Sequence, residues 1–149
     1  FGVSYALLDL MEKGPWSLAN TILIETGGMK GRRKEMIKSD LHQILKTGFG
    51  LPVVHSEYGM TELLSQAYAH KDGRFHCPPW MKVLTRDTED PFSYVQNKTG
   101  GVNVIDLANL NSCAFIATQD LAILQQDGSF ELLGRFDNSD LRGCNLMIS

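Results

Sequence analysis

The sequence predicts an α/β fold in which a parallel sheet with crossover helices is followed by a β-rich lobe. In residues 1–79, segments with helical apolar spacing alternate with short β-branched runs. Strands that alternate with helices in this way are typical of a parallel sheet. From residue 80 onward, strand-like runs follow one another without a helical pattern between them. We therefore expect an α/β half over residues 1–79 and a β-rich lobe over residues 80–149.

Five elements are expected in the first half. Apolar residues recur at helical spacing in three segments, which are Ser4–Lys13, Lys34–Lys46 and Thr61–Ala69. Two short β-branched runs, Asn20–Glu25 and Leu51–Ser56, have the composition of buried strands. Each run precedes one of the later helices, which is the order of a crossover connection.

Four strands are expected in the second half, over Trp80–Thr85, Val102–Leu107, Phe115–Leu124 and Phe130–Leu133. The last two are separated by a short segment that ends in Asp127-Gly128, and Asp-Gly is a strong hairpin signal. The polar segment from Arg86 to Gly100 contains Pro91 and is expected to be a loop.

Composition and charge exclude several classes of protein. The chain has 149 residues, of which 43% are hydrophobic and 21% charged, close to the globular average and unlike a disordered chain. A net charge of -3 argues against nonspecific binding to nucleic acid or anionic membranes. No apolar run reaches the roughly 18 residues of a membrane helix. Three distant cysteines without CxxC spacing indicate reduced thiols in a cytoplasmic protein.

The first candidate site is the pair Gly27-Gly28, which directly follows a predicted strand and precedes a predicted helix. Paired glycines let the backbone approach a flat ligand closely, and the N-terminus of a following helix favours an anion. An ordinary tight turn accounts for the pair equally well.

The second candidate is Tyr58-Gly59-Met60-Thr61-Glu62, at a predicted strand-to-helix junction. The ring of Tyr58 could stack on a base, and Gly59 lets the backbone turn. Thr61 offers a hydroxyl to a phosphate at the start of the helix. Glu62 is a carboxylate of the kind that Mg²⁺ binds beside phosphates. The alternative is a helix N-cap, with Thr61 as the capping residue.

The third and fourth candidates are expected to face each other across the predicted hairpin. Asp120 interrupts the run Phe115–Leu124, where a carboxylate could accept hydrogen bonds from both hydroxyls of a ribose. Arg135 follows 15 residues later, so the two side chains are expected to meet at one strand end. The simpler alternatives are an edge-strand or turn aspartate and a surface salt bridge.

Together these motifs resemble a known superfamily. YGMTE, TQD and GRFD followed by LRG occur in the order of the nucleotide-site motifs of the adenylate-forming (acyl-CoA synthetase-like, ANL) superfamily. The stretches ILIETGGMKGRRKEM, HSEYGMTELLSQAYA and LGRFDNSDLRGCNL are similar to LuxE-type acyl-protein synthetases, a branch near the phenylacetate-CoA ligases. The resemblance runs along nearly the whole chain. It implies that the chain is the C-terminal portion of the large domain of such an enzyme.

The resemblance implies that ATP and Mg²⁺ are used to convert a fatty or other carboxylic acid into an acyl-adenylate. The nucleotide-binding residues implied in this way are Gly27, Gly28, Tyr58, Gly59, Thr61, Asp120 and Arg135. Tyr58 would stack on adenine, Thr61 would contact phosphate and Glu62 would hold Mg²⁺. Asp120 would bind the ribose hydroxyls with the help of Arg135. Asp137 matches the hinge between the large and small domains of these enzymes.

The chain departs from the family pattern in three ways. Gln119 stands where the family usually has glycine. The Ser/Thr/Gly/Lys-rich phosphate loop and the C-terminal domain with its adenylation lysine are both absent. LuxE-type chains end soon after the GRFD motif, so we expect Ser149 to lie near a genuine C-terminus and Phe1 to be an internal residue. A fragment without the phosphate loop is expected to bind nucleotide weakly and to lack adenylation activity.

Cys144 is the acyl-carrying residue that the resemblance implies, because LuxE-type proteins hold the acyl group as a thioester on a cysteine near the C-terminus. It lies five residues before the end of the chain and follows Arg142-Gly143. A neighbouring arginine favours the thiolate, which is the nucleophilic form. The alternative is an inert small residue.

A structural zinc ion is a further suggestion, since some relatives in the phenylacetate-CoA ligase branch bind one near this stretch. His70, His76 and Cys77 are the suggested ligands, and Cys113 is the candidate for a fourth.

Several functions stay open. The expected one is an acyl-protein synthetase whose partner is an acyl-accepting reductase or carrier protein, without nucleic acid and without a membrane span. An acyl- or aryl-CoA ligase is the alternative enzyme. A non-catalytic nucleotide-binding module and a scaffold for an acyl-transfer partner are the alternatives outside catalysis.

Overall fold

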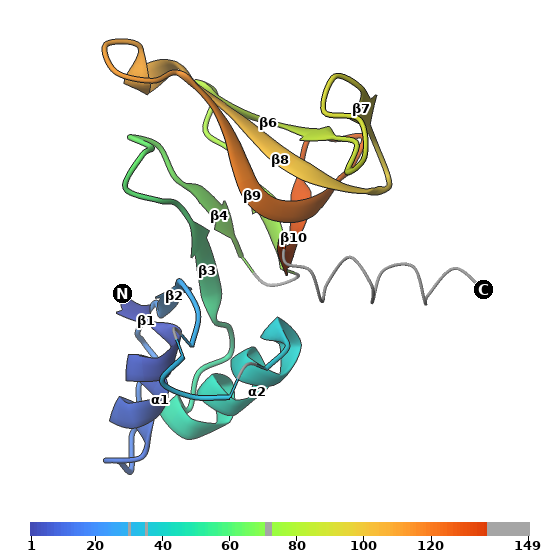
Figure 1. Cartoon of the computed structure of the whole chain (residues 1–149). Helices are drawn as coiled ribbons and strands as arrows, with labels where there is room; N and C mark the ends of the chain where they lie inside the picture. The colour runs from blue at the N-terminus through green and yellow to red at the C-terminus, as the bar shows by residue number, and fades with distance from the viewer. Residues whose placement is uncertain (30, 35, 71–72, 137–149) are drawn as a thin grey trace, which may run out of the picture. The chain divides into compact units, whose positions relative to one another are not determined.

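The structure is a computed structural model that describes residues 1–29, 31–34, 36–70 and 73–136. The chain divides into two compact units. Unit 1 comprises residues 1–61 and 66–75, and unit 2 comprises residues 62–65 together with the chain from residue 76 onward. The helices and strands of both units are labelled in Figure 1.

Unit 1 contains two helices and a mixed sheet. The strands β1 (Gly2–Val3), β2 (Ile24–Thr26) and β3 (His55–Tyr58) are parallel neighbours. The helices α1 (Ser4–Met11) and α2 (Lys38–Phe49) connect them in turn. Strand β4 (Ala67–Ala69) then pairs with β3 in the antiparallel direction, and β5 (Arg74–His76) lies beside β4. Parallel pairing with crossover helices is therefore restricted to β1–β3, and a parallel sheet is not confirmed for the unit as a whole.

Both helices bury one face in the core of unit 1. Their buried side chains pack in one cluster, which contains Leu7, Leu8, Leu41, Leu45 and Phe49. The buried residues of α2 recur every four positions, as amphipathic spacing predicts. The helix starts at Lys38, four residues later than predicted, and ends at Phe49. The following Gly50 caps it with a φ of 66°, which glycine tolerates.

The helix expected over Thr61–Ala69 is wrong. Residues 61–62 form a turn, and Ala67–Ala69 is β4. From Leu63 to Ala69, buried side chains alternate with more exposed ones, which is the period of a strand and not of a helix. The alternative in which Thr61 caps this helix is wrong for the same reason.

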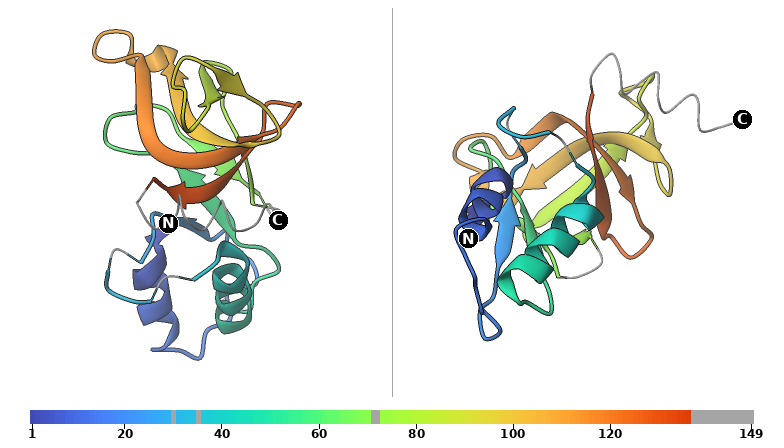
Figure 2. Two further views of the ribbon diagram at one scale, coloured as in Figure 1. Left: turned by 45° about the vertical axis from the view of Figure 1, so that its right-hand side comes forward. Right: turned by 90° about the horizontal axis from the view of Figure 1, so that it is seen from below.

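Unit 2 is an antiparallel sheet in which the strands follow the order β10-β9-β8-β6-β7. The strands are β6 (Met81–Arg86), β7 (Tyr94–Val95), β8 (Thr99–Asp106), β9 (Phe115–Leu124) and β10 (Phe130–Arg135). A short 3₁₀ helix, η1 (Leu107–Asn109), separates β8 from β9. Figure 2 shows from two further directions that β9 is strongly curved. The buried side chains include Val83, Val102, Val104, Leu124 and Phe130.

The predicted strands of the second half are confirmed, and so is the hairpin between β9 and β10. The N–H of Gln125 donates to the carbonyl of Ser129 at 2.8 Å, and Gly128 adopts a φ of 83°. The segment expected to be one loop contains β7, which pairs with the end of β6. In the described ranges, no helix has the length and apolar character needed to cross a membrane.

Candidate functional site

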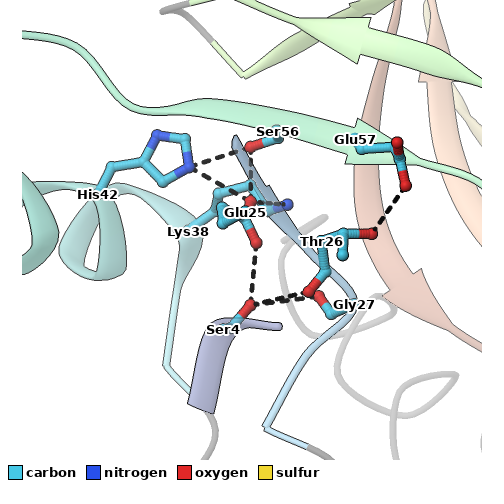
Figure 3. A network of polar contacts seen from close by, with 8 residues as sticks. All are labelled: Ser4, Glu25, Thr26, Gly27, Lys38, His42, Ser56 and Glu57. Carbon is cyan, nitrogen blue, oxygen red and sulfur yellow. Dashed lines mark hydrogen bonds and ion pairs between the residues drawn. The ribbon is translucent and has the colours of Figure 1, made fainter. Parts of the chain in front are cut away.

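Two of the predicted motifs lie at one edge of the sheet in unit 1. Thr26, the last residue of β2, is the register partner of Glu57 in β3, so the carboxyl ends of both strands are neighbours. The hydroxyl of Thr26 donates to Oε1 of Glu57 at 3.3 Å (Figure 3). Gly27 follows β2 and Gly59 follows β3. Ligands of α/β sheets bind outside the carboxyl ends of the strands, so this edge is the place where a nucleotide is expected.

The pair Gly27-Gly28 combines a backbone conformation that favours glycine with open space. Gly27 has a φ of 68°, and a Cβ placed on Gly28 would meet no atom within 4 Å. The predicted position directly before a helix is wrong, because α2 begins only at Lys38. The N-terminus of that helix is therefore not adjacent to the glycine pair in the chain.

Tyr58 is a buried side chain, with 6% of its surface exposed. Its ring lies edge to face against Phe75, with 6.2 Å between the ring centroids. The neighbouring Glu57 makes a second side-chain contact, in which its Oε2 accepts a hydrogen bond from the hydroxyl of Tyr68 at 3.0 Å. The aromatic residue of the YGMTE motif is thus packed into unit 1, and Thr61 beyond it is exposed.

Sequence reasoning missed a buried charge in β2. Glu25 has 0% of its surface exposed, and its carboxylate contacts four side chains from three other elements (Figure 3). They are Ser4 at 2.9 Å, Lys38 at 2.7 Å, His42 at 3.3 Å and Ser56 at 2.5 Å. The signal that could have revealed this network is the single acidic residue at the end of the apolar run TILIE.

The network keeps Glu25 ionised. Burial raises the pKa of this carboxyl, but the hydrogen bond from His42, the charge of Lys38 and the hydroxyl of Ser56 outweigh burial and lower the pKa from 4.5 to about 2. His42 and Ser56 do not form a nucleophile-base pair that is aligned by a third group, because Nε2 of His42 contacts both Ser56 and Glu25. The network therefore connects α1, α2, β2 and β3 and is a structural element beside the glycine edge.

Residues 62–65 belong to unit 2 and are held there by two polar side chains. The carbonyl of Glu62 accepts a hydrogen bond from the side-chain amide of Asn109 at 2.7 Å. The buried carboxylate of Asp106 accepts from the N–H groups of Leu64 and Ser65, each at 2.9 Å, and from the hydroxyl of Ser65 at 2.6 Å. Burial raises the pKa of Asp106, but these hydrogen bonds outweigh it, and the pKa is lowered. The side chain of Glu62 is exposed.

Asp120 and Arg135 meet as the sequence predicts. They are register partners on β9 and β10, and Nε of Arg135 lies 3.6 Å from Oδ1 of Asp120. The Asp120 side chain is 17% exposed and that of Arg135 is 71% exposed. The edge-strand interpretation of Asp120 is wrong, because β9 lies between β8 and β10. The pair places a partly exposed carboxylate in the middle of β9 beside an exposed guanidinium at the end of β10, and both groups can bind the hydroxyls of a sugar.

Two irregularities of the sheet place this pair. Leu133 is an extra residue in β10, and the following Gly134 has a φ of 146°, which only glycine adopts readily. In β9 a second bulge covers Thr118–Asp120, opposite Val102. Asn97 is the only non-glycine residue of the described part with a positive φ. Gln119 therefore adopts its conformation without strain, although the family usually has glycine here.

Several predicted residues find no structural counterpart. Asp137 and Cys144 lie outside the described residues. Within the described ranges, no three His, Cys, Asp or Glu side chains gather closely enough to hold a metal ion, so the suggested zinc site of His70, His76 and Cys77 has no support. Burial raises the pKa of Cys77 to about 11, which keeps its thiol protonated.

The sequence matches no model of a known protein family. It is 22% identical over 139 residues to the long-chain-fatty-acid–luciferin-component ligase of Aliivibrio fischeri, a match that covers 85% of this chain and 37% of that protein. Among solved structures it is similar to ATP-bound MatB from Rhodopseudomonas palustris, with a TM-score of 0.66 and 18% identity over 90% of this chain and 30% of MatB. The chain has the fold of an adenylate-forming ligase.

A second solved structure supports this result. O-succinylbenzoate coenzyme A synthetase (MenE) from Bacillus subtilis, in complex with ATP and magnesium ion, matches with a TM-score of 0.61 and 20% identity, over 89% of this chain and 30% of MenE. The sequence match to the luciferin-component ligase agrees with the predicted resemblance to LuxE-type enzymes, and MatB and MenE share the fold of this chain. The chain spans about a third of the length of the luciferin-component ligase and of MatB.

Proposed function

We propose that the chain is the nucleotide-binding part of an adenylate-forming acyl-protein synthetase. The observation that carries the proposal is the Asp120–Arg135 pair, which the register of β9 and β10 brings together in a fold shared with ATP-bound MatB. In the reaction, a fatty or other carboxylic acid attacks the α-phosphorus of ATP, and pyrophosphate leaves. An acyl-adenylate remains.

The residues of this chain would bind and orient the nucleotide. Asp120 would accept hydrogen bonds from the ribose hydroxyls while Arg135 neutralises its charge. Tyr58 would face the base, and Thr61 would contact phosphate. The exposed carboxylate of Glu62 suits Mg²⁺, which supplies positive charge beside the phosphates. The open space at Gly28 would allow the backbone to approach the nucleotide.

Cys144 would receive the acyl group in the second step. Its thiolate would attack the acyl carbonyl, the bond to AMP would break, and a protein thioester would form. The match to a fatty-acid ligase of the luciferin system is the observation that favours a fatty acid over other acids. An acyl-CoA ligase is the second candidate, since MenE is a coenzyme A synthetase.

The proposal is tested on the product of the complete reading frame that contains this chain. We expect fatty-acid-dependent exchange of pyrophosphate into ATP, and a labelled protein thioester that Cys144→Ser abolishes while the exchange persists. Cys113→Ser is the control, because this exposed thiol is not assigned to the reaction. Thioester labelling that survives Cys144→Ser contradicts the role of Cys144. Strict dependence on free coenzyme A identifies the ligase instead, and ATP binding without exchange identifies a nucleotide-binding module.

A further inference from the structure

Arg86, the last residue of β6, faces a stretch of irregular backbone in the neighbouring strands. The register of β8 and β9 passes from Gly101 opposite Leu121 to Asn103 opposite Ala117. Strand β9 therefore has more residues than β8 over this interval, and the backbone around Thr118 leaves the regular ladder. Backbone carbonyls outside a ladder need other donors when they are buried.

The guanidinium of Arg86 supplies these donors. Its Nη1 donates to the carbonyl of Val102 at 2.9 Å and to Oδ1 of Asn103 at 2.7 Å. Its Nη2 donates to the carbonyl of Thr118 at 2.6 Å. One planar group thus binds both strands of the bulge. A lysine ammonium has no comparable fork of donors, so arginine and lysine are not equivalent at this position.

Glycine at position 101 leaves the space that this guanidinium occupies. A Cβ on Gly101 would lie 2.6 Å from Cζ of Arg86, closer than any real contact. The pair Gly100-Gly101 was not part of any predicted site. A side chain at position 101 would displace the Arg86 guanidinium, which crosses β8 at that point.

The contacts of Arg86 continue to the candidate ribose-binding residue. The hydroxyl of Thr118 donates to the carbonyl of Val102 at 3.1 Å and accepts from the N–H of Asp120 at 3.0 Å. The carbonyl of Gln119 accepts from the N–H of Phe136 at 2.7 Å, and the Phe136 ring lies 5.4 Å from the guanidinium of Arg86. The backbone on both sides of the Asp120–Arg135 pair is therefore fixed by groups that contact Arg86.

We propose that Arg86 is a positioning residue, which holds the Thr118–Asp120 bulge so that the Asp120 carboxylate stays aligned for both hydroxyls of a ribose. The inference rests on the proposed nucleotide-binding function and deepens it. Arg86 does not contact the nucleotide in this proposal. Its effect is selective for the sugar, because the residues expected to contact base and phosphate do not depend on the bulge.

The test compares AMP with 2′-deoxy-AMP by titration calorimetry on the 149-residue chain. The variants are Arg86→Lys and Arg86→Met, and Lys82→Met is the control on an exposed position of the same strand. We expect the wild type to prefer AMP, and both Arg86 variants to reduce this preference by about tenfold, the effect of one hydrogen bond to a charged group. Lys82→Met should keep the preference. A merely stabilising role of Arg86 would lower the melting temperature and leave the preference unchanged.

Each outcome decides the proposal. If the Arg86 variants keep the full preference for AMP, the proposal is overturned. If Arg86→Met does not fold, Gly101→Ala replaces it, since it displaces the guanidinium and keeps its charge. If the wild type binds neither nucleotide, the proposed function fails. Hydrogen exchange then tests separately whether Arg86 holds the bulge. Arg86→Lys should then deprotect the amides of Asp120 and Phe136, and unchanged protection overturns the inference.

Discussion

Glu25 and Lys38 form an ion pair inside unit 1, with 2.7 Å between Oε1 and Nζ. The carboxylate is fully buried, whereas 34% of the lysine side chain is exposed. Such a pair contributes little when both partners are present, but a buried carboxylate without its cation is strongly destabilising. The main effect of the Lys38 ammonium is therefore to offset the cost of burying the Glu25 charge.

Lys38→Met is expected to lower the free energy of unfolding by about 2 kcal/mol, which is less than the cost of breaking a fully buried pair because Lys38 is partly in water. Urea denaturation measures this change. Lys34→Met, at an exposed position four residues earlier, should have no measurable effect. If Lys38→Met unfolds at the same urea concentration as the wild type, the ion pair has no role in stability.

The same carboxylate makes the fold sensitive to acid. The pKa of Glu25 is lowered from 4.5 to about 2 in the folded state, so its contribution is fully present above pH 4.5 and is lost as the pH falls toward 2. The ionised form of Glu25 contributes about 3 kcal/mol to the free energy of unfolding through this difference in pKa. Glu25→Gln should therefore reduce the loss of stability between neutral pH and pH 2, measured by urea denaturation at each pH. Identical pH slopes of the two proteins would refute a depressed pKa.

Asp106→Asn is expected to destabilise unit 2 by about 2 kcal/mol. The buried Asp106 carboxylate accepts four hydrogen bonds, and the asparagine amide is uncharged and has only one acceptor oxygen. Thermal unfolding followed by circular dichroism measures the loss. Hydrogen exchange should show that the N–H of Ser65 loses its protection. Asp90→Asn is the matched control, since Asp90 also accepts from a backbone N–H and a hydroxyl but lies in an exposed loop. Equal effects of both substitutions would contradict the special position of Asp106.

Arg135→Met separates binding from stability. The Arg135 side chain is 71% exposed, so its loss should change the free energy of unfolding by less than about 0.5 kcal/mol. Binding of AMP should weaken by about tenfold if the guanidinium supports the ribose contact of Asp120. Calorimetric titration and urea denaturation of the same sample give both values. A large stability loss with unchanged affinity would assign a purely structural role to the pair.

The part of the fold that the sequence predicts is the part that depends on local patterns. The hairpin of β9 and β10 follows from two strand-like runs around Asp127-Gly128. Strand β7 was not predicted, because Tyr94–Val95 is extended only through pairing with Thr85 and Arg86. The segment after Thr61 was predicted to be helical, but Asp106, more than 40 residues away, binds the N–H groups of Leu64 and Ser65.

The candidate site shows the same division. The meeting of Asp120 and Arg135 follows from their spacing around a hairpin turn. The bulges that adjust this register do not follow from the spacing, because they depend on contacts between strands. Glu25 was readable as an isolated charge in an apolar run. Its partners Lys38 and His42 lie one helical turn apart on α2, and only the packing of that helix against β2 brings them to the carboxylate.

The bulge at Thr118–Asp120 also determines how this sheet tolerates changes of chain length. Between the register pairs that flank it, β9 advances four positions, from Ala117 to Leu121, while β8 advances two, from Asn103 to Gly101. The difference is even, so side chains before and after the bulge keep the same alternation between the faces of the sheet. Deleting two residues here would leave the strands in phase and remove the proposed ribose contact. Deleting one would turn each following side chain to the opposite face, including the buried Leu121, Ala122 and Leu124.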